Sequence, residues 1–283
     1  MKNSKALFKD FIDSITLKDS RNEIESIAYL AFENIFGLTM TEVHAAKEIT
    51  DHSLVDRLWE IGKRINKHEP IQYILGEALF YNRMFVVNPA VLIPRPETEE
   101  LVRLVVNHIN EKGGDFNILD IGTGSGCIAV TLGLELPSSK IFATDISEEA
   151  LQTATANARK FGVKVNFQKH DILKDALPFS PDVIVSNPPY IPYDERDAMP
   201  ANVVEYEPAQ ALFVDENNPL LFYKTLVARG VESLEGGGLL AVEINERFGR
   251  AIHLLFDEYG FREIEILKDV YGKDRIVKGI LSS

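Results

Sequence analysis

A short apolar run, a glycine-rich loop and a second apolar run, in that order, constrain the fold of this chain more than any other feature. Residues 117–121 read Asn-Ile-Leu-Asp-Ile, which is typical of a buried strand. An apolar helix is expected from Cys127, and the loop between them consists of Gly122, Thr123, Gly124, Ser125 and Gly126. Glycines let a backbone turn sharply and approach a ligand closely, and the first turn of a helix offers N–H groups without partners inside the helix. The pattern therefore predicts a strand–loop–helix unit with a ligand site at the end of the strand.

Further apolar runs alternate with helical patterns along the rest of the chain. The next strands are expected at 140–144, 164–168, 182–185 and 239–244. Because strands separated by helices pair in parallel, these segments predict a doubly wound α/β sheet. Two final β-rich runs, 261–267 and 275–281, leave no room for a helix between them and predict an antiparallel addition at the sheet edge. Together the runs predict a mostly parallel, seven-stranded sheet.

An acidic residue stands at the end of each of the first three predicted strands. Asp120 precedes the glycine loop, and Asp145 and Asp171 follow the next two strands. The loop has the spacing G-x-G-x-G, not the G-x-G-x-x-G of a pyrophosphate binder, and Asp120 suits a cationic ligand better than a diphosphate. An acid in the place of Asp145 binds ribose hydroxyls in such folds, and Asp171 could accept from an adenine amine beside the apolar wall of Ile172. Each acid alone could cap a helix, but three in succession predict a ligand crevice.

The fourth predicted strand ends in Ser186-Asn187-Pro188-Pro189-Tyr190. The prolines have a fixed φ and no N–H group, so their carbonyls are presented outward. Asn187 adds a side-chain acceptor and Tyr190 adds an aromatic face. Two acceptors beside an aromatic ring form a receptor for a planar –NH2 group. Asn-Pro is also a common way to open a turn, but its position at a strand end of the predicted crevice favours a functional role.

The first quarter of the chain keeps a helical period and carries no catalytic pattern. Apolar residues recur at helical spacing along 24–35, and we expect a small helical bundle over residues 1–77. Its role is either packing alone or, as we favour, recognition of a protein substrate. Paired β-type runs around Asn82-Arg83 predict a β-hairpin linker over residues 78–92. Residues 93–283 then form the domain that carries the crevice, with Arg95 and Thr98 near its mouth.

Composition limits the partners and the compartment. The formal net charge of −13 disfavours broad binding to DNA or RNA, which needs many phosphate-facing Lys and Arg residues. The single cysteine, Cys127, lies in an apolar run and is expected in the core, and no Cys/His cluster has zinc spacing, so we expect no metal. The first residues lack an apolar signal core, and no stretch is long and apolar enough to span a bilayer. We therefore expect a cytoplasmic protein that contacts no membrane.

At these residues the chain resembles the release factor glutamine methyltransferases of the PrmC/HemK family, which are class I S-adenosylmethionine-dependent enzymes with a Rossmann-like catalytic domain. The resemblance is carried by Ile-Pro-Arg-Pro-Glu-Thr-Glu at 93–99, Asp120 to Gly126, Asp145, Asn187 to Tyr190 and Glu207-Pro208. It implies that the loop from Gly122 to Gly126, Asp145, Asp171, Ile172 and Asn187 bind S-adenosylmethionine. It also implies a substrate site formed by Asn187, Pro188, Pro189, Tyr190 and Glu207, with Asn187, Pro188 and Tyr190 as the catalytic residues.

The resemblance further implies the reaction. A methyl group would pass from S-adenosylmethionine to the side-chain amide nitrogen of the glutamine in the Gly-Gly-Gln motif of class-1 peptide chain release factors, modulating translation termination and leaving S-adenosylhomocysteine. A carboxamide nitrogen is a weak nucleophile because its lone pair is delocalised. Acceptors for both of its hydrogens would raise its electron density and aim it, so orientation and charge stabilisation should supply most of the acceleration. We expect the enzyme to act as a monomer without direct nucleic-acid contact.

Three other interpretations of the residues remain open at this point. An adenine-N6 nucleic-acid methyltransferase would share Asn187 to Tyr190, although the acidic net charge and the lack of a basic recognition module disfavour it. A nucleotide-dependent oxidoreductase would need different glycine spacing. A non-catalytic binding module would have no reason to keep an acceptor pair at a strand end.

Overall fold

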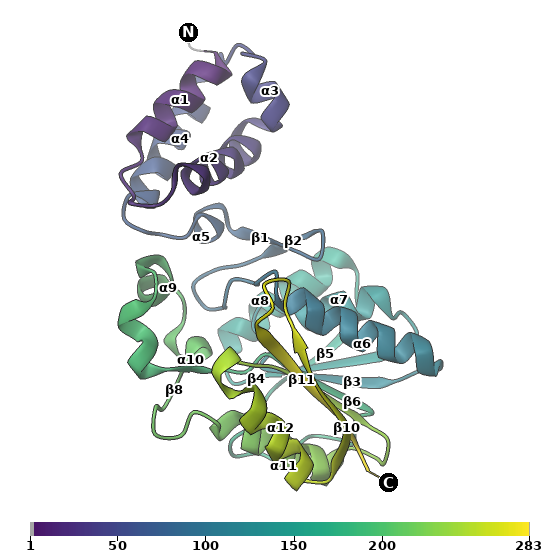
Figure 1. Cartoon of the computed structure of the whole chain (residues 1–283). Coiled ribbons are helices and arrows are strands. Elements are labelled where there is room, and N and C mark those ends of the chain that lie inside the picture. The colour runs from purple at the N-terminus through teal and green to yellow at the C-terminus, as the bar shows by residue number, and fades with distance from the viewer. Residues whose placement is uncertain (1–2, 283) are drawn as a thin grey trace. The chain divides into compact units, whose positions relative to one another are not determined.

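The structure, a computed structural model, describes residues 3–282 and divides into two compact units (Figure 1). The smaller unit comprises the described residues up to Glu77 together with Pro200–Tyr206. The larger unit comprises Ala78–Met199 and the described residues from Glu207 onward, so it includes residues 78–92, which the sequence assigned to a linker.

The smaller unit is helical. Its helices are α1 (Ser4–Ser14), α2 (Arg21–Phe36), α3 (Met40–His44), α4 (His52–Ile65), α5 (Ile71–Leu75) and α9 (Ala201–Tyr206). The first four pack around an apolar core that includes the buried side chains of Phe11, Phe32 and Leu58. Ser20 and Glu23 form a capping box that fixes the start of α2. The Tyr206 hydroxyl donates to the carbonyl oxygen of Lys67 at 2.6 Å, which attaches α9 to this unit.

The larger unit contains a seven-stranded sheet with the order β10-β11-β9-β6-β3-β4-β5. The strands are β3 (Asn117–Ile121), β4 (Lys140–Asp145), β5 (Val165–Lys169), β6 (Val183–Ser186), β9 (Leu239–Glu243), β10 (Phe261–Lys268) and β11 (Asp274–Leu281). Strands β5, β4, β3, β6 and β9 pair in parallel in that order. The predicted mostly parallel sheet is confirmed, and its chain order reverses direction between β3 and β6.

Helices cover both faces of this sheet (Figure 1). One apolar core lies under α6 (Thr98–Lys112), α7 (Cys127–Glu135) and α8 (Glu148–Phe161), and the other lies under α11 (Leu221–Ser233) and α12 (Gly249–Glu258). Neighbouring strand residues divide between the two cores: Ile118 belongs to the first and Leu119 to the second. Both faces of the central strands are therefore buried, which explains why these strands read as continuous apolar runs.

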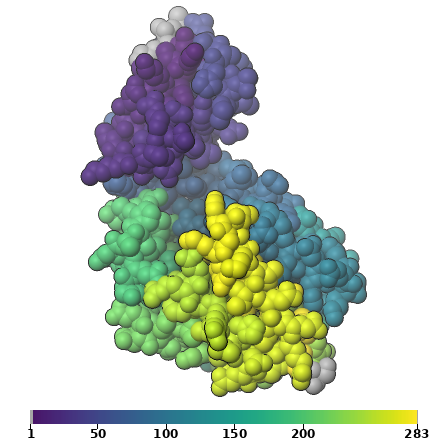
Figure 2. Space-filling model, in the orientation of Figure 1, coloured from purple at the N-terminus to yellow at the C-terminus, as the bar shows by residue number. Residues whose placement is uncertain are grey.

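The last strand does not lie at the edge of the sheet. Strand β11 inserts between β9 and β10 and pairs antiparallel with both, so β10 is the edge strand. The predicted antiparallel addition of the two final strands at the sheet edge is confirmed, and β11 is the inner strand of the pair. Figure 2 shows the carboxyl-terminal residues, coloured yellow, as a large part of one surface.

Residues 77–86 form a small hairpin of β1 (Glu77–Phe80) and β2 (Arg83–Val86). The turn residues are Tyr81 and Asn82, with φ of 50° and 57°, one residue earlier than the Asn82-Arg83 turn that the sequence suggested. Two positive φ values are typical of the tight turns that suit the twist of a hairpin. Phe80 and Phe85 are buried in the core under α6 and α7, so the hairpin is part of the larger unit's packing.

The remaining elements of the larger unit are short. They are β7 (Ile191–Pro192), the 3-10 helix η1 (Tyr193–Ala198), α10 (Ala209–Leu212), β8 (Phe213–Val214) and the 3-10 helix η2 (Glu246–Phe248). Strands β7 and β8 pair with each other outside the main sheet. Within residues 3–282, none of the helices combines the length and the apolar character needed to cross a membrane.

Candidate active site

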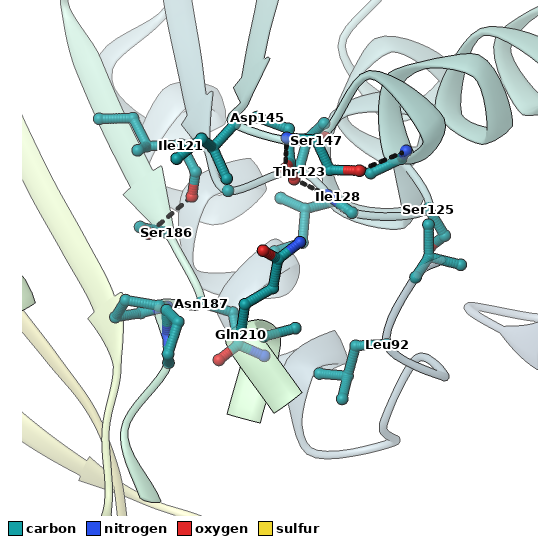
Figure 3. Close-up of a pocket in the computed structure, with 18 of the residues that line it drawn as sticks. Leu92, Ile121, Thr123, Ser125, Ile128, Asp145, Ser147, Ser186, Asn187 and Gln210 are labelled. Atoms are coloured by element: carbon teal, nitrogen blue, oxygen red, sulfur yellow. Dashed lines mark hydrogen bonds between the residues drawn. The ribbon is translucent and has the colours of Figure 1, made fainter. Parts of the chain in front are cut away.

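A pocket of about 230 Å³ opens at the carboxyl ends of β3, β4 and β6 (Figure 3). This is the end of a parallel sheet at which doubly wound folds bind ligands. The pocket is lined by the predicted site residues Gly122, Thr123, Gly124, Ser125, Asp145, Asp171, Ile172, Asn187, Pro188 and Pro189, and by Arg95 and Thr98. Gly126, Tyr190 and Glu207 lie outside this lining.

The glycine loop is held against the end of β4. The N–H groups of Gly122 and Thr123 both donate to the carbonyl oxygen of Thr144, at 2.8 and 2.9 Å. Gly122 and Gly124 have φ of +75° and +53°, and an added Cβ at either would meet nothing within 4 Å. Their positive φ favours glycine, and because glycine has no side chain, bare backbone forms this part of the pocket wall. Gly126 has another role. A Cβ added there would lie 2.9 Å from the Cβ of Ala154, so a larger residue would prevent the loop from approaching α8 as closely.

Asp145 joins the loop to the start of α8. Its Oδ2 accepts from the N–H of Gly124 at 2.8 Å, and its Oδ1 accepts from the N–H of Ser147 at 2.9 Å. Burial raises the pKa of Asp145, and the backbone N–H groups partly oppose this effect by stabilising the carboxylate. Each carboxylate oxygen can accept more than one hydrogen bond, so the side chain retains capacity for a ligand in the pocket.

Asp120 is completely enclosed behind the loop. Its Oδ2 accepts from the Thr123 hydroxyl at 2.6 Å, while Oδ1 has no hydrogen-bond partner within the described part of the chain. Burial raises the pKa of Asp120 to about 7, with a smaller contribution from the charge of Asp145. The side chain therefore changes its charge near neutral pH, where a cation nearby would favour the carboxylate.

Asp171 and Ile172 form the next corner of the pocket. The Asp171 carboxylate accepts from the N–H of Leu173 at 3.1 Å and pairs with Lys174 at 2.8 Å, which lowers its pKa. The side chain of Ile172 is buried and presents an apolar surface beside it. An acceptor next to an apolar wall could bind the edge and the face of an adenine.

Asn187 is oriented by groups from two other elements. Its Nδ2 donates to Oγ1 of Thr98, at the start of α6, over 3.3 Å. The Thr98 hydroxyl in turn donates to Oε2 of Glu243, the last residue of β9, over 2.7 Å. The carboxylate of Glu243 is fully buried, and burial raises its pKa. Because the Asn187 NH2 group is already used in this way, its Oδ1 remains available to the pocket.

Tyr190 lies beside the same carboxylate. Its hydroxyl donates to Oε1 of Glu243 over 3.2 Å, and its backbone oxygen accepts from Nδ2 of Asn245 over 3.4 Å. Burial and the charge of Glu243 raise the pKa of Tyr190, so the phenol stays protonated. The hydroxyl is thus directed into the protein, and the role of the aromatic face of Tyr190 in binding a planar –NH2 group stays a prediction.

Glu207 is buried in a contact with the segment that precedes α6. Its Oε1 pairs with the guanidinium of Arg95 at 2.6 Å, and its Oε2 accepts from the N–H of Ile93 at 3.1 Å. Both oxygens therefore have partners within the larger unit. The pair holds the Arg95 segment, which does line the pocket, against the loop before α10.

Several site residues were not singled out from the sequence. Apolar side chains complete the pocket, namely Val91, Leu92, Ile128, Leu173, Phe222 and Leu226. Gln210 on α10 extends its side chain into the pocket (Figure 3). Glu243 could have been found, because it is an acid at the end of a predicted strand, as Asp120 and Asp145 are. The apolar residues carry no signal that separates them from ordinary core residues.

The pocket fits the cofactor that the resemblance implies. The glycines leave open backbone at its wall, and Asp145 and Asp171 offer acceptors for hydroxyl and amine groups. The Ser125 hydroxyl lines the pocket and, like Oδ1 of Asp120, has no hydrogen-bond partner among residues 3–282. A buried polar atom without a partner is costly unless a ligand or water satisfies it. In the same residues, no group of three or more His, Cys, Asp or Glu side chains is arranged to hold a metal ion.

Comparison with known proteins gives consistent matches. A family model described as the methyltransferase small domain matches residues 96–206. The release factor glutamine methyltransferase of Bacteroides thetaiotaomicron is 42% identical over 90% of this chain and 92% of its own length. That of Flavobacterium psychrophilum is 38% identical over 95% of both chains. Among solved structures, a methyltransferase from Pyrococcus furiosus shares the fold with a TM-score of 0.54, at 19% identity over 78% of this chain and 98% of its own.

Proposed function

Because the chain belongs to the release factor glutamine methyltransferase family, we propose that it transfers a methyl group from S-adenosylmethionine to the side-chain amide nitrogen of a glutamine in a class-1 peptide chain release factor. The glutamine is that of the Gly-Gly-Gln motif. The observation that carries the proposal is one pocket in which the glycine loop and Asp145 meet the acceptors of Asn187 and Pro188.

The cofactor half of the pocket is the side formed by β3 and β4. Gly122 and Gly124 provide bare backbone, Asp145 accepts the ribose hydroxyls, and Asp171 accepts the adenine amine beside Ile172. The carboxylates of Asp120 and Asp145 favour the positive charge of the ligand. When bound, S-adenosylmethionine supplies an activated methyl group on a sulfonium ion, so this chain needs no group to activate the methyl donor.

The substrate half is the side formed by Asn187 and Pro188. The Asn187 Oδ1 and the Pro188 carbonyl accept the two hydrogens of the target amide, which raises the electron density on its nitrogen and fixes its direction. The Asn187 NH2 group does not compete for this place because it donates to Thr98. Neither acceptor is a strong base, so the methylated nitrogen loses its extra proton to solvent water after the methyl group has left the sulfonium ion. Orientation supplies most of the acceleration.

The helical unit is assigned to recognition of the release factor. Its residues from Asn3 onward include no cluster of catalytic side chains, and its apolar core is its own. We propose that the enzyme acts as a monomer.

The decisive experiment supplies the purified protein with radiolabelled S-adenosylmethionine and one of three acceptors. These are a class-1 release factor, the same factor with the Gly-Gly-Gln glutamine changed to alanine, and duplex DNA containing adenine. We expect label only in the unmodified release factor. Label in DNA but not in the release factor would establish the adenine-N6 alternative and refute the proposal.

A variant connects this activity to the site. Asn187→Ala should lower kcat by about two to three orders of magnitude, the usual effect of losing one preorganised contact to the reacting group. Its affinity for the cofactor, measured by calorimetry, should change little. Asn110→Ala replaces an exposed asparagine on α6 and is the matched control, with the kcat of the unmodified protein. Equal rates in both variants would contradict the role of Asn187.

A further inference from the structure

Glu243 is an acid in a place that ordinarily excludes charge. Its side chain is buried at the end of β9 and does not line the pocket, so it cannot touch a ligand there. It accepts two hydrogen bonds from hydroxyl groups, one from Thr98 at 2.7 Å and one from Tyr190 at 3.2 Å. A buried carboxylate is costly, and replacement by apolar groups is often neutral or stabilising. Its presence therefore calls for an explanation beyond packing.

The direction of the hydrogen bonds supplies one. A carboxylate can only accept, so the single hydroxyl hydrogen of Thr98 is committed to Glu243. The Thr98 oxygen is then left with lone pairs, and only a donor can satisfy it. Asn187 meets this demand with its NH2 group at 3.3 Å. The two ends of the Asn187 amide are thereby distinguished, and its oxygen is turned away from Thr98.

We propose that Glu243 is a positioning residue that acts through Thr98 to hold the Asn187 amide with its oxygen toward the substrate amide. The inference rests on the proposed function, because it assigns a purpose to the Asn187 oxygen. Through its second oxygen the same carboxylate holds Tyr190. One buried acid therefore orients the first and the last side chain of the Asn-Pro-Pro-Tyr segment, those of Asn187 and Tyr190.

Burial disfavours the charged form of Glu243 and raises its pKa, while the hydroxyl of Thr98 and the guanidinium of Arg275, on the neighbouring strand β11, partly oppose this effect. The ion pair of Arg275 itself is with Asp269 at 3.0 Å. Without the carboxylate, the Thr98 hydroxyl could donate to the Asn187 oxygen instead. The amide would turn over and present its NH2 group to the substrate, where two donors would face each other.

Two shape-conserving variants test the relay. Glu243→Gln replaces two equivalent acceptors with one acceptor and one donor, and Thr98→Val removes the hydroxyl. Both should lower kcat by about ten- to a hundredfold, the range seen when supporting hydrogen bonds are removed in other sites. The dissociation constant of S-adenosylmethionine should change by less than about threefold, because Asn187 chiefly contacts the substrate amide. Thr98→Ser keeps the hydroxyl and should retain more activity than Thr98→Val. Glu258→Gln, an exposed glutamate on α12, is the matched control.

Coupling distinguishes positioning from general damage. In an Asn187→Ala background, Glu243→Gln should lower kcat by less than about twofold, because the residue that it positions is already gone. An equal loss in both backgrounds, or an unchanged kcat for Glu243→Gln in an otherwise active enzyme, would overturn the proposal.

A spectroscopic measurement does not depend on catalysis. The side-chain NH2 signals of Asn187, assigned by their absence in Asn187→Ala, should show one hydrogen protected from exchange in the unmodified protein. That protection should be lost in Thr98→Val and weakened in Glu243→Gln, whether or not release factor is the substrate. Protection that persists in Thr98→Val refutes the relay, whereas a failure of the unmodified protein to methylate release factor refutes only the proposed function.

Discussion

Asp120 offers a quantitative test, because a buried acid with a raised pKa makes stability depend on pH. Its pKa rises from 3.8 to about 7 in the folded protein. Between these values the folded protein keeps a proton that the unfolded chain has lost. Stability is therefore greatest below the unfolded pKa and falls as the pH rises toward the folded pKa. Asp120→Asn removes the titration while keeping the shape and an acceptor for Thr123.

The size of the effect follows from the shift. A shift of about three units corresponds to about 4 kcal/mol at a pH well above 7. Between pH 5 and pH 8 the free energy of unfolding of the unmodified protein should fall by about 2 to 3 kcal/mol relative to Asp120→Asn. The comparison is made between two pH values because the variant also places an NH2 group where Oδ1 has no partner, a cost that does not depend on pH.

Urea unfolding followed by circular dichroism measures this difference. Trp59 is the single tryptophan and lies in the smaller unit, so its fluorescence reports that unit and should respond equally in both proteins. Asp257→Asn, at an exposed position on α12, controls for the loss of a negative charge. Parallel stability curves for Asp120→Asn and the unmodified protein from pH 5 to pH 8 would show that Asp120 is not held neutral by burial.

Two other positions give sharp expectations. Gly126→Ala should lower the free energy of unfolding by more than about 1 kcal/mol, because it combines a φ of +79° with a Cβ contact of 2.9 Å to Ala154. Gly162 has a similar φ of +68°, but a Cβ added there would meet nothing within 4 Å, so Gly162→Ala should lower the free energy of unfolding by less in the same urea assay. Equal losses in the two variants would show that backbone strain alone matters. Glu207→Gln should cost about 1 to 3 kcal/mol, because it leaves Arg95 without its charged partner at 2.6 Å. Exposed Glu216→Gln should be neutral by the same measurement, and a neutral Glu207→Gln would show that the buried pair contributes nothing to stability.

The sequence predicts the parts of this structure that depend on local pattern. Apolar runs with glycine breaks located β3, β4, β6 and β9 closely, and the carboxyl ends of β3, β4 and β6 then located the pocket. The position of β11 between β9 and β10 was not predictable in this way, since strand pairing depends on residues far apart in the chain. The turn at Tyr81 and Asn82 lies one residue earlier than expected, because asparagine favours positive φ but the tyrosine before it gives no such signal.

The candidate site shows the same division between features that a local pattern predicts and features that depend on residues far apart in the chain. The types of side chain at Asp145 and Asn187 identified acceptors before their geometry was known. Their partners could not be identified, because Thr98 lies 89 residues from Asn187 in the chain and meets it only through the packing of α6 on the sheet. Glu207 illustrates the limit most clearly: it is found in a recognisable motif, yet its oxygens bind Arg95 and Ile93 inside the protein.

The insertion of β11 has a consequence for local unfolding. Among residues 3–282, strand β10 pairs with the sheet only through β11, so an opening that separates β11 from β9 releases both strands together. Their amide hydrogens should therefore exchange as one cooperative unit, with an opening free energy below that of the whole domain. Ile276 on β11 pairs with Glu243, and the carbonyl oxygen of Arg275 accepts from the N–H of Ile244. Opening at this edge thus reaches the end of β9 directly, and on heating we expect methylation to cease while the parallel strands from β5 to β6 are still protected from exchange.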